Sequence, residues 1–176
     1  ITISEGAAGV ITTTGATADG IEVLNSGTGN TAVTTAGTIT TTGAGINTIN
    51  NSTAGNATIT QTAGTITGGT NGINSLNDGT GSTNITVAGV VTGGTGVGIN
   101  TSDSDTISST TDNFATVTLN SGAVVSSTSG IAIQNDEGDS LTTVNSGAAI
   151  QGKVILGEGN DNLVINGTAN ISGATL

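Results

Sequence analysis

The sequence predicts an all-β protein, a right-handed, single-stranded parallel β-helix with three short strands per coil and about six to seven coils. A unit from Ala57 to Ser82 turns the chain once, and the same order of residues begins again at Thr83. Within this unit Ile59, Ile66 and Ile73 lie seven residues apart, each inside a short β-favouring run. Glycines separate the runs, which indicates corners between strands.

The composition favours an ordered chain that forms a single domain over residues 1–176. It contains 30 Gly and one Phe, and no Pro, Cys, Met, Trp, Tyr or His. Disordered chains are poor in β-branched residues, whereas Ile, Val and Thr recur here at regular intervals. The scarcity of aromatic residues fits a narrow interior.

The charge and the lack of a long apolar run argue against two classes of partner. Twelve acids against one base give a formal net charge of −11. Such a surface repels phosphate backbones and anionic lipids, so we expect no nucleic-acid partner. No apolar run approaches the length of a membrane span, so we expect no direct membrane insertion of this segment.

Taking the chain in order, the predicted coils cover residues 1–30, 31–56, 57–82, 83–114, 115–140, 141–162 and 163–176. The chain begins in mid-pattern and stops in a partial repeat, which predicts that it is a segment of a longer protein. Within Thr58-Ile59-Thr60 the alternation places the aliphatic side chain on one side of a strand and both threonines on the other.

Three inward faces follow from this pattern. The first is assigned to Ile3, Val33, Ile59, Ile85, Val117, Val144 and Ile165. The second is assigned to Ile11, Ile39, Ile66, Val91, Val124, Ile150 and Ile171. The third is assigned to Ile21, Ile46, Ile73, Ile99, Ile131 and the pair Val154–Ile155.

A polar position recurs four residues beyond the third-face aliphatic residue. It is occupied by Asn25, Asn50, Asn77, Asp103 and Asn135. Asn and Asp suit a tight turn and bond to their own backbone, and stacked copies can form a hydrogen-bonded ladder. The alternative is a row of ligand-binding side chains.

The fourth coil has a longer return segment between Ile99 and Val117 than its neighbours. Insertions in repeat proteins map to loops on one face, often the binding face. The candidate partner-binding residues are Asp103, Asp105, Asp112 and Phe114. The alternative is a neutral insertion with Phe114 folded over the edge of the core.

Two acidic loops are candidate calcium sites, and no other cofactor is expected. One runs from Asn135 to Asp139 and offers oxygen ligands to a hard cation. The other, residues 157–163, resembles one copy of a calcium-binding nonapeptide, but no second copy is present to complete the site. The alternative in both cases is a solvated turn. The candidate ligands are Asp136, Glu137, Asp139 and Asp161.

Catalysis and ice binding are both disfavoured. Acid–base chemistry needs clustered carboxylates with a titrating or cationic partner, and Lys153 is the only basic side chain in a sequence without His, Tyr or Cys. We therefore expect no enzymatic activity. The Thr-Xaa-Thr pattern of ice-binding solenoids appears on the second face at Thr38–Thr40 and Thr65–Thr67 and then stops, so these threonines are interpreted as strand formers.

The whole chain resembles a Gram-negative autotransporter passenger domain. The resemblance rests on Asn/Thr/Gly-rich coils of variable length, the near absence of basic residues, the lack of Cys and the closing stretch 156–167. It implies a cell-surface β-helical stalk or adhesin that is secreted ahead of a C-terminal membrane barrel. The implied partners are a host-cell or matrix receptor, or sister bacteria through self-association. The alternative is a polysaccharide-processing or polysaccharide-binding β-helix of the phage tailspike or lyase type.

Overall fold

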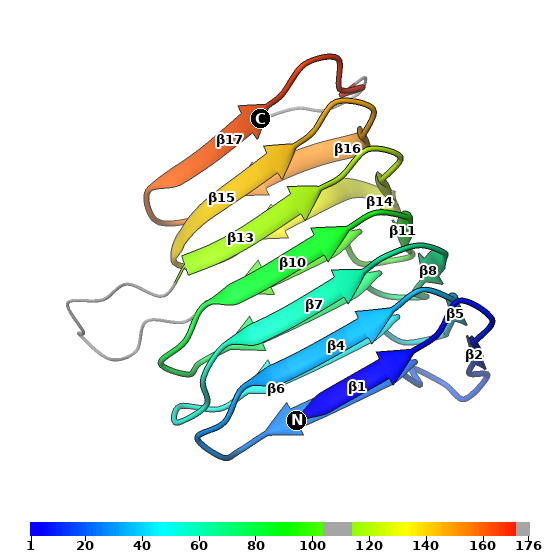
Figure 1. The fold of residues 1–176 in the computed structure, drawn as a ribbon, viewed down its shortest axis with the longest axis vertical. Coiled ribbons are helices and arrows are strands. Elements are labelled where there is room, and N and C mark those ends of the chain that lie inside the picture. The colour runs from blue at the N-terminus through cyan, green and yellow to red at the C-terminus, as the bar shows by residue number, and fades with distance from the viewer. Residues whose placement is uncertain (104–113, 172–176) are drawn as a thin grey trace.

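The computed structural model describes residues 1–103 and 114–171, and every regular element in these ranges is a β-strand (Figure 1). The strands are β1 Thr2–Glu5, β2 Val10–Thr12, β3 Ile21–Asn25, β4 Thr31–Thr35, β5 Thr38–Thr40, β6 Ile46–Asn50, β7 Ala57–Gln61, β8 Thr65–Thr67, β9 Ile73–Asn77, β10 Thr83–Val87, β11 Val90–Gly93, β12 Ile99–Ser102, β13 Phe114–Leu119, β14 Val124–Asn135, β15 Asp139–Val144, β16 Ala149–Leu156 and β17 Asp161–Ile165. The described ranges contain no helix long and apolar enough to cross a bilayer.

The first sheet is the front face in Figure 1, and its seven strands are stacked in the order β1-β4-β7-β10-β13-β15-β17. Every pairing is parallel and connects strands one coil apart. The front strands run to the right, the chain turns back behind them and each coil lies above the previous one (Figure 1). This sense of winding is right-handed, so the predicted right-handed parallel β-helix is confirmed.

The second sheet holds the other two faces of the solenoid. Its strand order is β2-β5-β8-β11-β14-β12-β9-β6-β3, and β16 pairs with β14. The first four coils have three separate strands, as predicted. In the fifth and sixth coils, β14 and β16 each cross both faces as one strand, with register shifts between Ser126 and Ile131 and between Ile131 and Ile133.

The core is a column of aliphatic side chains enclosed by the three faces. Ile59, Ile66 and Ile73 are fully buried, as the repeat predicts. Ile59 pairs with Val33 below and Ile85 above, so equivalent side chains from successive coils lie over one another. Stacking is therefore what removes this apolar stripe from water, because no single coil can bury it.

On the first face, two sequence assignments, Val144 and Ile165, are wrong by two residues, and Ile165 is exposed. Val117 pairs with Thr142, which is buried, and not with Val144. Val144 pairs with Leu119 and Ile165 instead. A two-residue slip leaves a side chain on the same side of a strand, so Val144 is still buried although its column is different.

The second and third faces each carry one correction in the fifth coil. Val125, not Val124, pairs with Val91 and is fully buried. On the third face Ile133, not Ile131, pairs with Ile99. Both shifts fall in β14, where the chain departs from the three-strand pattern.

Two kinds of glycine form the corners. Gly64 and Gly122 adopt positive φ angles of 77° and 86°, which glycine tolerates better than other residues. Gly45 and Gly72 instead allow close stacking, because a Cβ at Gly45 would lie 2.5 Å from the Gly72 carbonyl oxygen. The predicted corner role of these residues is confirmed.

Candidate functional site

Asn25, Asn50 and Asn77 form a buried column where the third face turns toward the first. They pair in successive coils and are at most 5% exposed. Each Nδ2 donates to a carbonyl of its own return segment, as Asn50 does to Gly55 at 2.9 Å. The side chains therefore hold turns, as the structural interpretation predicts. The asparagines do not bond to one another directly, but Asn25 Nδ2 donates to the Thr31 hydroxyl at 3.2 Å and that hydroxyl donates to Asn50 Oδ1 at 2.8 Å, so Thr31 links the first two coils.

Asn135 does not belong to this column. It pairs with Thr101 and accepts a hydrogen bond from the Thr101 hydroxyl at 2.6 Å. Its amide still donates to the carbonyl of Gly138 in the return segment, at 3.1 Å. The expected turn function is therefore present, but the position is two residues out of register.

Asp103 occupies the fourth place in the column, directly after Ser102, which pairs with Leu76. It is fully buried, and its two carboxylate oxygens accept hydrogen bonds from the hydroxyl and the amide of Thr83, at 2.6 and 3.2 Å. Burial raises the pKa of this carboxyl to about 6, against the hydrogen bonds from Thr83, which lower it. The expectation that Asp103 faces a partner is wrong, because its carboxylate points into the protein.

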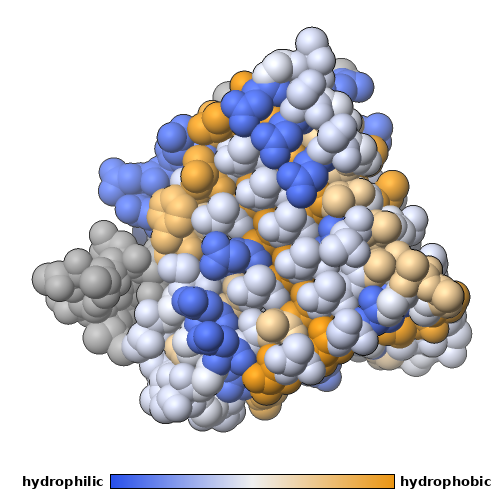
Figure 2. Space-filling view, in the orientation of Figure 1, coloured by the Kyte–Doolittle hydropathy of each residue, from blue (hydrophilic) through white to orange (hydrophobic). Residues whose placement is uncertain are grey.

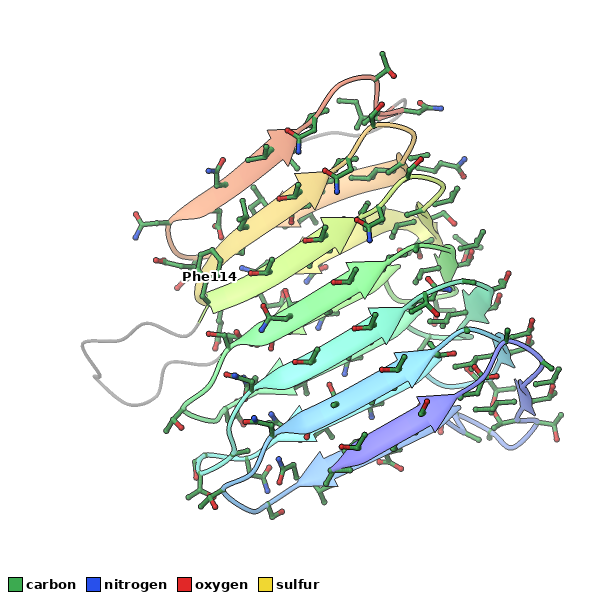
Figure 3. The ribbon with its side chains drawn as sticks, in the orientation of Figure 1. Phe114 is labelled. Carbon is green, nitrogen blue, oxygen red and sulfur yellow. The ribbon has the colours of Figure 1, made fainter. Side chains whose placement is uncertain are left out.

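The other loop candidates divide into two groups. Asp105 and Asp112 lie outside the described residues. Phe114 begins β13 and is half-buried at the edge of the first sheet (Figure 3). It lies on the outward side of the strand, like Thr116, so it does not fold over the core.

The four candidate calcium ligands have different surroundings and different hydrogen-bond partners. Asp139 accepts hydrogen bonds from the backbone and side-chain nitrogens of Asn160, at 2.7 and 3.3 Å. Asp161 accepts one from the Ser140 hydroxyl at 2.6 Å, whereas Asp136 and Glu137 are exposed. No group of three or more acidic, His or Cys side chains close enough to share a metal occurs in the described ranges. Calcium binding here stays a prediction, and the contacts present are those of turns.

An amide ladder on the outer surface of the third face was not predicted. Asn74 donates to Asn47 Oδ1 at 2.9 Å, and Asn100 donates to Asn74 Oδ1 at 3.0 Å. Asn71 also donates to Asn74 Oδ1, at 3.2 Å. The signal in the sequence was the Ile-Asn pair that begins the three consecutive third-face strands β6, β9 and β12.

A hydroxyl-rich surface covers the outer side of the first sheet and was not predicted either. One outward column contains Ser4, Thr34, Thr60, Thr86, Thr118, Thr143 and Val164. The adjacent column contains Thr2, Ala32, Thr58, Asn84, Thr116, Leu141 and Asn162. Neither column contains a charged residue, and we call the two together the threonine face.

The threonine face is turned toward the viewer in Figures 2 and 3. Near-neutral residues form rows across its centre, and short side chains project from successive strands at matching positions. The sequence signal was the Thr-Xaa-Thr pattern of β7 and β13, at Thr58–Thr60 and Thr116–Thr118.

Comparisons of the chain with protein-family models, curated proteins and solved structures gave no match.

Proposed function

We propose that this chain is a non-enzymatic segment of a surface-displayed, autotransporter-type β-helix, which acts as a stalk and as an adhesive surface. The observation that carries the proposal is the continuous stack of in-register parallel strands along one column of aliphatic side chains. Such a stack is stiff, since each coil is bonded to the coils on both sides. The proposed contacts are a host-cell or matrix receptor, or sister bacteria.

The distribution of polar groups supports a structural and presenting role. The buried amides of Asn25, Asn50 and Asn77 are used by the return turns. The exposed faces instead present threonines and amides in regular rows, which offer many weak contacts in place of one deep site. Weak contacts that repeat along a rod add up when many of them form together.

The alternative function is the processing or binding of a polysaccharide. It requires two carboxylates flanking a sugar bond, one of them with a raised pKa. The one carboxyl in the described ranges whose pKa is raised is Asp103, and its side chain is enclosed and bonded to Thr83. This placement favours the adhesive function, because an enclosed carboxyl cannot reach a glycosidic oxygen.

Beads coated with the purified chain test both functions together. Adhesion to cultured cells, to immobilised matrix proteins or between beads, without release of sugar from polysaccharides, supports the adhesive function. Release of reducing sugar would support the alternative. Beads that neither adhere nor release sugar would contradict the adhesive part of the proposal.

The stalk is tested separately by resistance to proteolysis. Trypsin is unsuitable because the chain contains a single basic residue, so a protease of broad specificity such as proteinase K is required. We expect a large fragment to persist under native conditions and to disappear once the chain is unfolded in denaturant. Rapid and complete digestion of the native chain would contradict a stiff stalk.

A further inference from the structure

We propose that the threonine face is an ice-binding surface. The inference does not depend on the proposed function, since it concerns what one face of the solenoid contacts and not how the chain is displayed. The surface comprises the two outward columns of the first sheet.

The first support is the regular spacing of the hydroxyl groups. Thr34, Thr60 and Thr86 belong to β4, β7 and β10, and their residues pair directly across the sheet. Parallel strands lie about 4.8 Å apart and alternate residues along a strand about 6.6 Å apart. These two repeats approach the oxygen spacings on the principal faces of hexagonal ice.

The second support is that these hydroxyls are not used within the protein. Within the described ranges, the side chains of Thr34, Thr60, Thr86, Thr118 and Thr143 have no hydrogen-bond partner. Each hydroxyl can donate one hydrogen bond and accept two, so the column presents a row of free donors and acceptors. The asparagines of the third face differ, because they bond to one another.

The third support is the absence of charge. The chain carries twelve acids, yet none stands in either column. Asp139 lies on the same outward side of β15 as Leu141 and Thr143, at the start of the strand and one outward position before the columns. Charged groups hold their own hydration shells and would disturb an ice-like layer of water. Threonine combines a methyl group with a hydroxyl, so it can order water without holding it as strongly as an ion does.

The shape of the sheet is also suitable. Figure 1 shows the seven strands of the first sheet following one another with little change of direction. Flat sheets are unusual because strands normally twist, and stacking of coils suppresses the twist here. One column is unbroken threonine from Thr34 in β4 to Thr143 in β15. In the adjacent column Thr58 and Thr116 alternate with Ala32, Asn84 and Leu141, so this column adds hydroxyls only in every second coil.

The second face offers a narrower array and serves as an internal comparison. Its hydroxyl column is Thr12, Thr40, Thr67, Thr92 and Ser126, and Thr92 and Ser126 bond to each other at 3.2 Å. The neighbouring column holds Thr38 and Thr65 between Val10 and the valines Val90 and Val124, so both columns carry threonine in only two coils. We therefore assign ice binding to the first sheet.

The test is partition of the full chain into slowly growing ice. We expect the chain to be incorporated into the ice, and Thr86→Lys at the centre of the array to abolish incorporation. Thr53→Lys, at an exposed return segment, adds the same charge and should leave incorporation unchanged. Thr86→Val keeps the β-branched shape and removes one hydroxyl, so it should fold and give a partial loss.

Each outcome of the partition test decides the assignment. Exclusion of the unmodified chain from ice would overturn the proposal. Loss of incorporation with Thr67→Lys but not with Thr86→Lys would also overturn it, because the second face would then be the binding surface. Circular dichroism and the melting temperature of each variant confirm that the solenoid is intact.

Discussion

Asp103 differs from the asparagines of its column by the replacement of an amide nitrogen with an oxygen, and this replacement puts an ionisable group inside the core. In the second coil, the Thr31 hydroxyl donates to Asn50 Oδ1 at 2.8 Å. In the fourth coil, the Thr83 hydroxyl donates to Asp103 Oδ1 in the same way. The second oxygen of Asp103 also accepts from the Thr83 N–H, so an amide fits this place with its oxygen toward that N–H and its Nδ2 toward the Thr83 hydroxyl oxygen. The carboxylate must in addition bear the cost of burial.

We predict that Asp103→Asn stabilises the protein at neutral pH. Below about pH 4, Asp103 is protonated in both the folded and the unfolded chain. As the pH rises toward 6 the unfolded chain releases the proton first, so the free energy of unfolding falls, and above about 6 the loss is complete. The rise in pKa from 3.8 to about 6 corresponds to about 3 kcal/mol. Denaturant unfolding at pH 4 and pH 7.5 measures the change in the free energy of unfolding caused by Asp103→Asn. A change of equal size at both pH values would contradict the prediction.

Glu5 acts in the opposite direction. The Thr35 hydroxyl donates to Glu5 at 2.5 Å, and the amides of Gly37 and Ala36 add further hydrogen bonds, so the pKa of Glu5 is lowered from 4.5 despite partial burial. Its contribution to stability is therefore present above pH 4.5 and is lost as the pH falls through the lowered pKa. Unfolding experiments on Asp103→Asn below pH 4.5 should show this acid-side loss without interference from Asp103.

The corner glycines allow two causes of strain to be separated. Gly64 and Gly122 both have positive φ. A Cβ at Gly64 would lie 1.9 Å from the Gly37 carbonyl oxygen, whereas a Cβ at Gly122 would have no neighbouring atom within 4 Å. We predict that Gly122→Ala costs about 1 to 2 kcal/mol, for the left-handed backbone alone. Gly64→Ala should cost clearly more, because the coils must also separate. Thermal unfolding of both variants measures the difference, and equal losses would show that coil contact at Gly64 adds nothing.

At the scale of strands, the sequence predicts the fold well because a unit that recurs along the whole chain leaves few alternative folds. Register is harder to read in the fifth coil. Val124 and Val125 are adjacent and both aliphatic, so alternation cannot decide which one faces inward, and a slip of one residue exchanges the two sides of a strand. Thr142 is a second case, since a buried threonine in an aliphatic column carries no hydrophobic signal.

The candidate sites were predicted less well than the fold. Asp103 reads as a loop residue because it precedes the long return segment, and only its pairing position shows that it is buried. The Asn47–Asn74–Asn100 ladder depends on which side chains face outward in successive coils. Sequence patterns indicate where strands lie, but contacts between distant coils require the register.

The amide ladder predicts a cost that an isolated surface asparagine does not have. Asn74→Ala removes hydrogen bonds with Asn47, Asn71 and Asn100, each of which contributes roughly 0.5 to 1.5 kcal/mol. We expect a loss of about 1 to 3 kcal/mol. Asn84→Ala is the matched control, since Asn84 is exposed and forms no side-chain hydrogen bond within the described ranges. Its effect should stay within about 0.5 kcal/mol. If chemical denaturation shows equal losses for the two variants, the ladder does not stabilise the stack.

At the scale of the whole molecule, the solenoid separates its functions by face. The interior holds aliphatic columns, the return segments hold Asp136, Glu137 and Glu158 as exposed acids, and the threonine face has no charge in its two columns. Like charges repel each other, so we expect the acidic return segments to oppose lateral association and the uncharged columns to be the surfaces that make contacts. One repeat therefore supplies both a scaffold and a surface.

The stack also predicts that coils are interchangeable units. Thr31, Ala57 and Thr83 are register partners in successive coils, so deletion of residues 57–82 brings Thr83 directly above Thr31 and restores every pairing. We expect this variant to fold into a rod about 4.8 Å shorter and to be less stable, because one interface between coils is lost. Deletion of residues 57–69 removes β7 and β8 but keeps β9, which leaves the first and third faces out of phase, so this shorter deletion should unfold the chain. Circular dichroism, small-angle scattering and thermal unfolding distinguish the two variants. If the shorter deletion is tolerated better than the whole coil, the coils are not the units of stability.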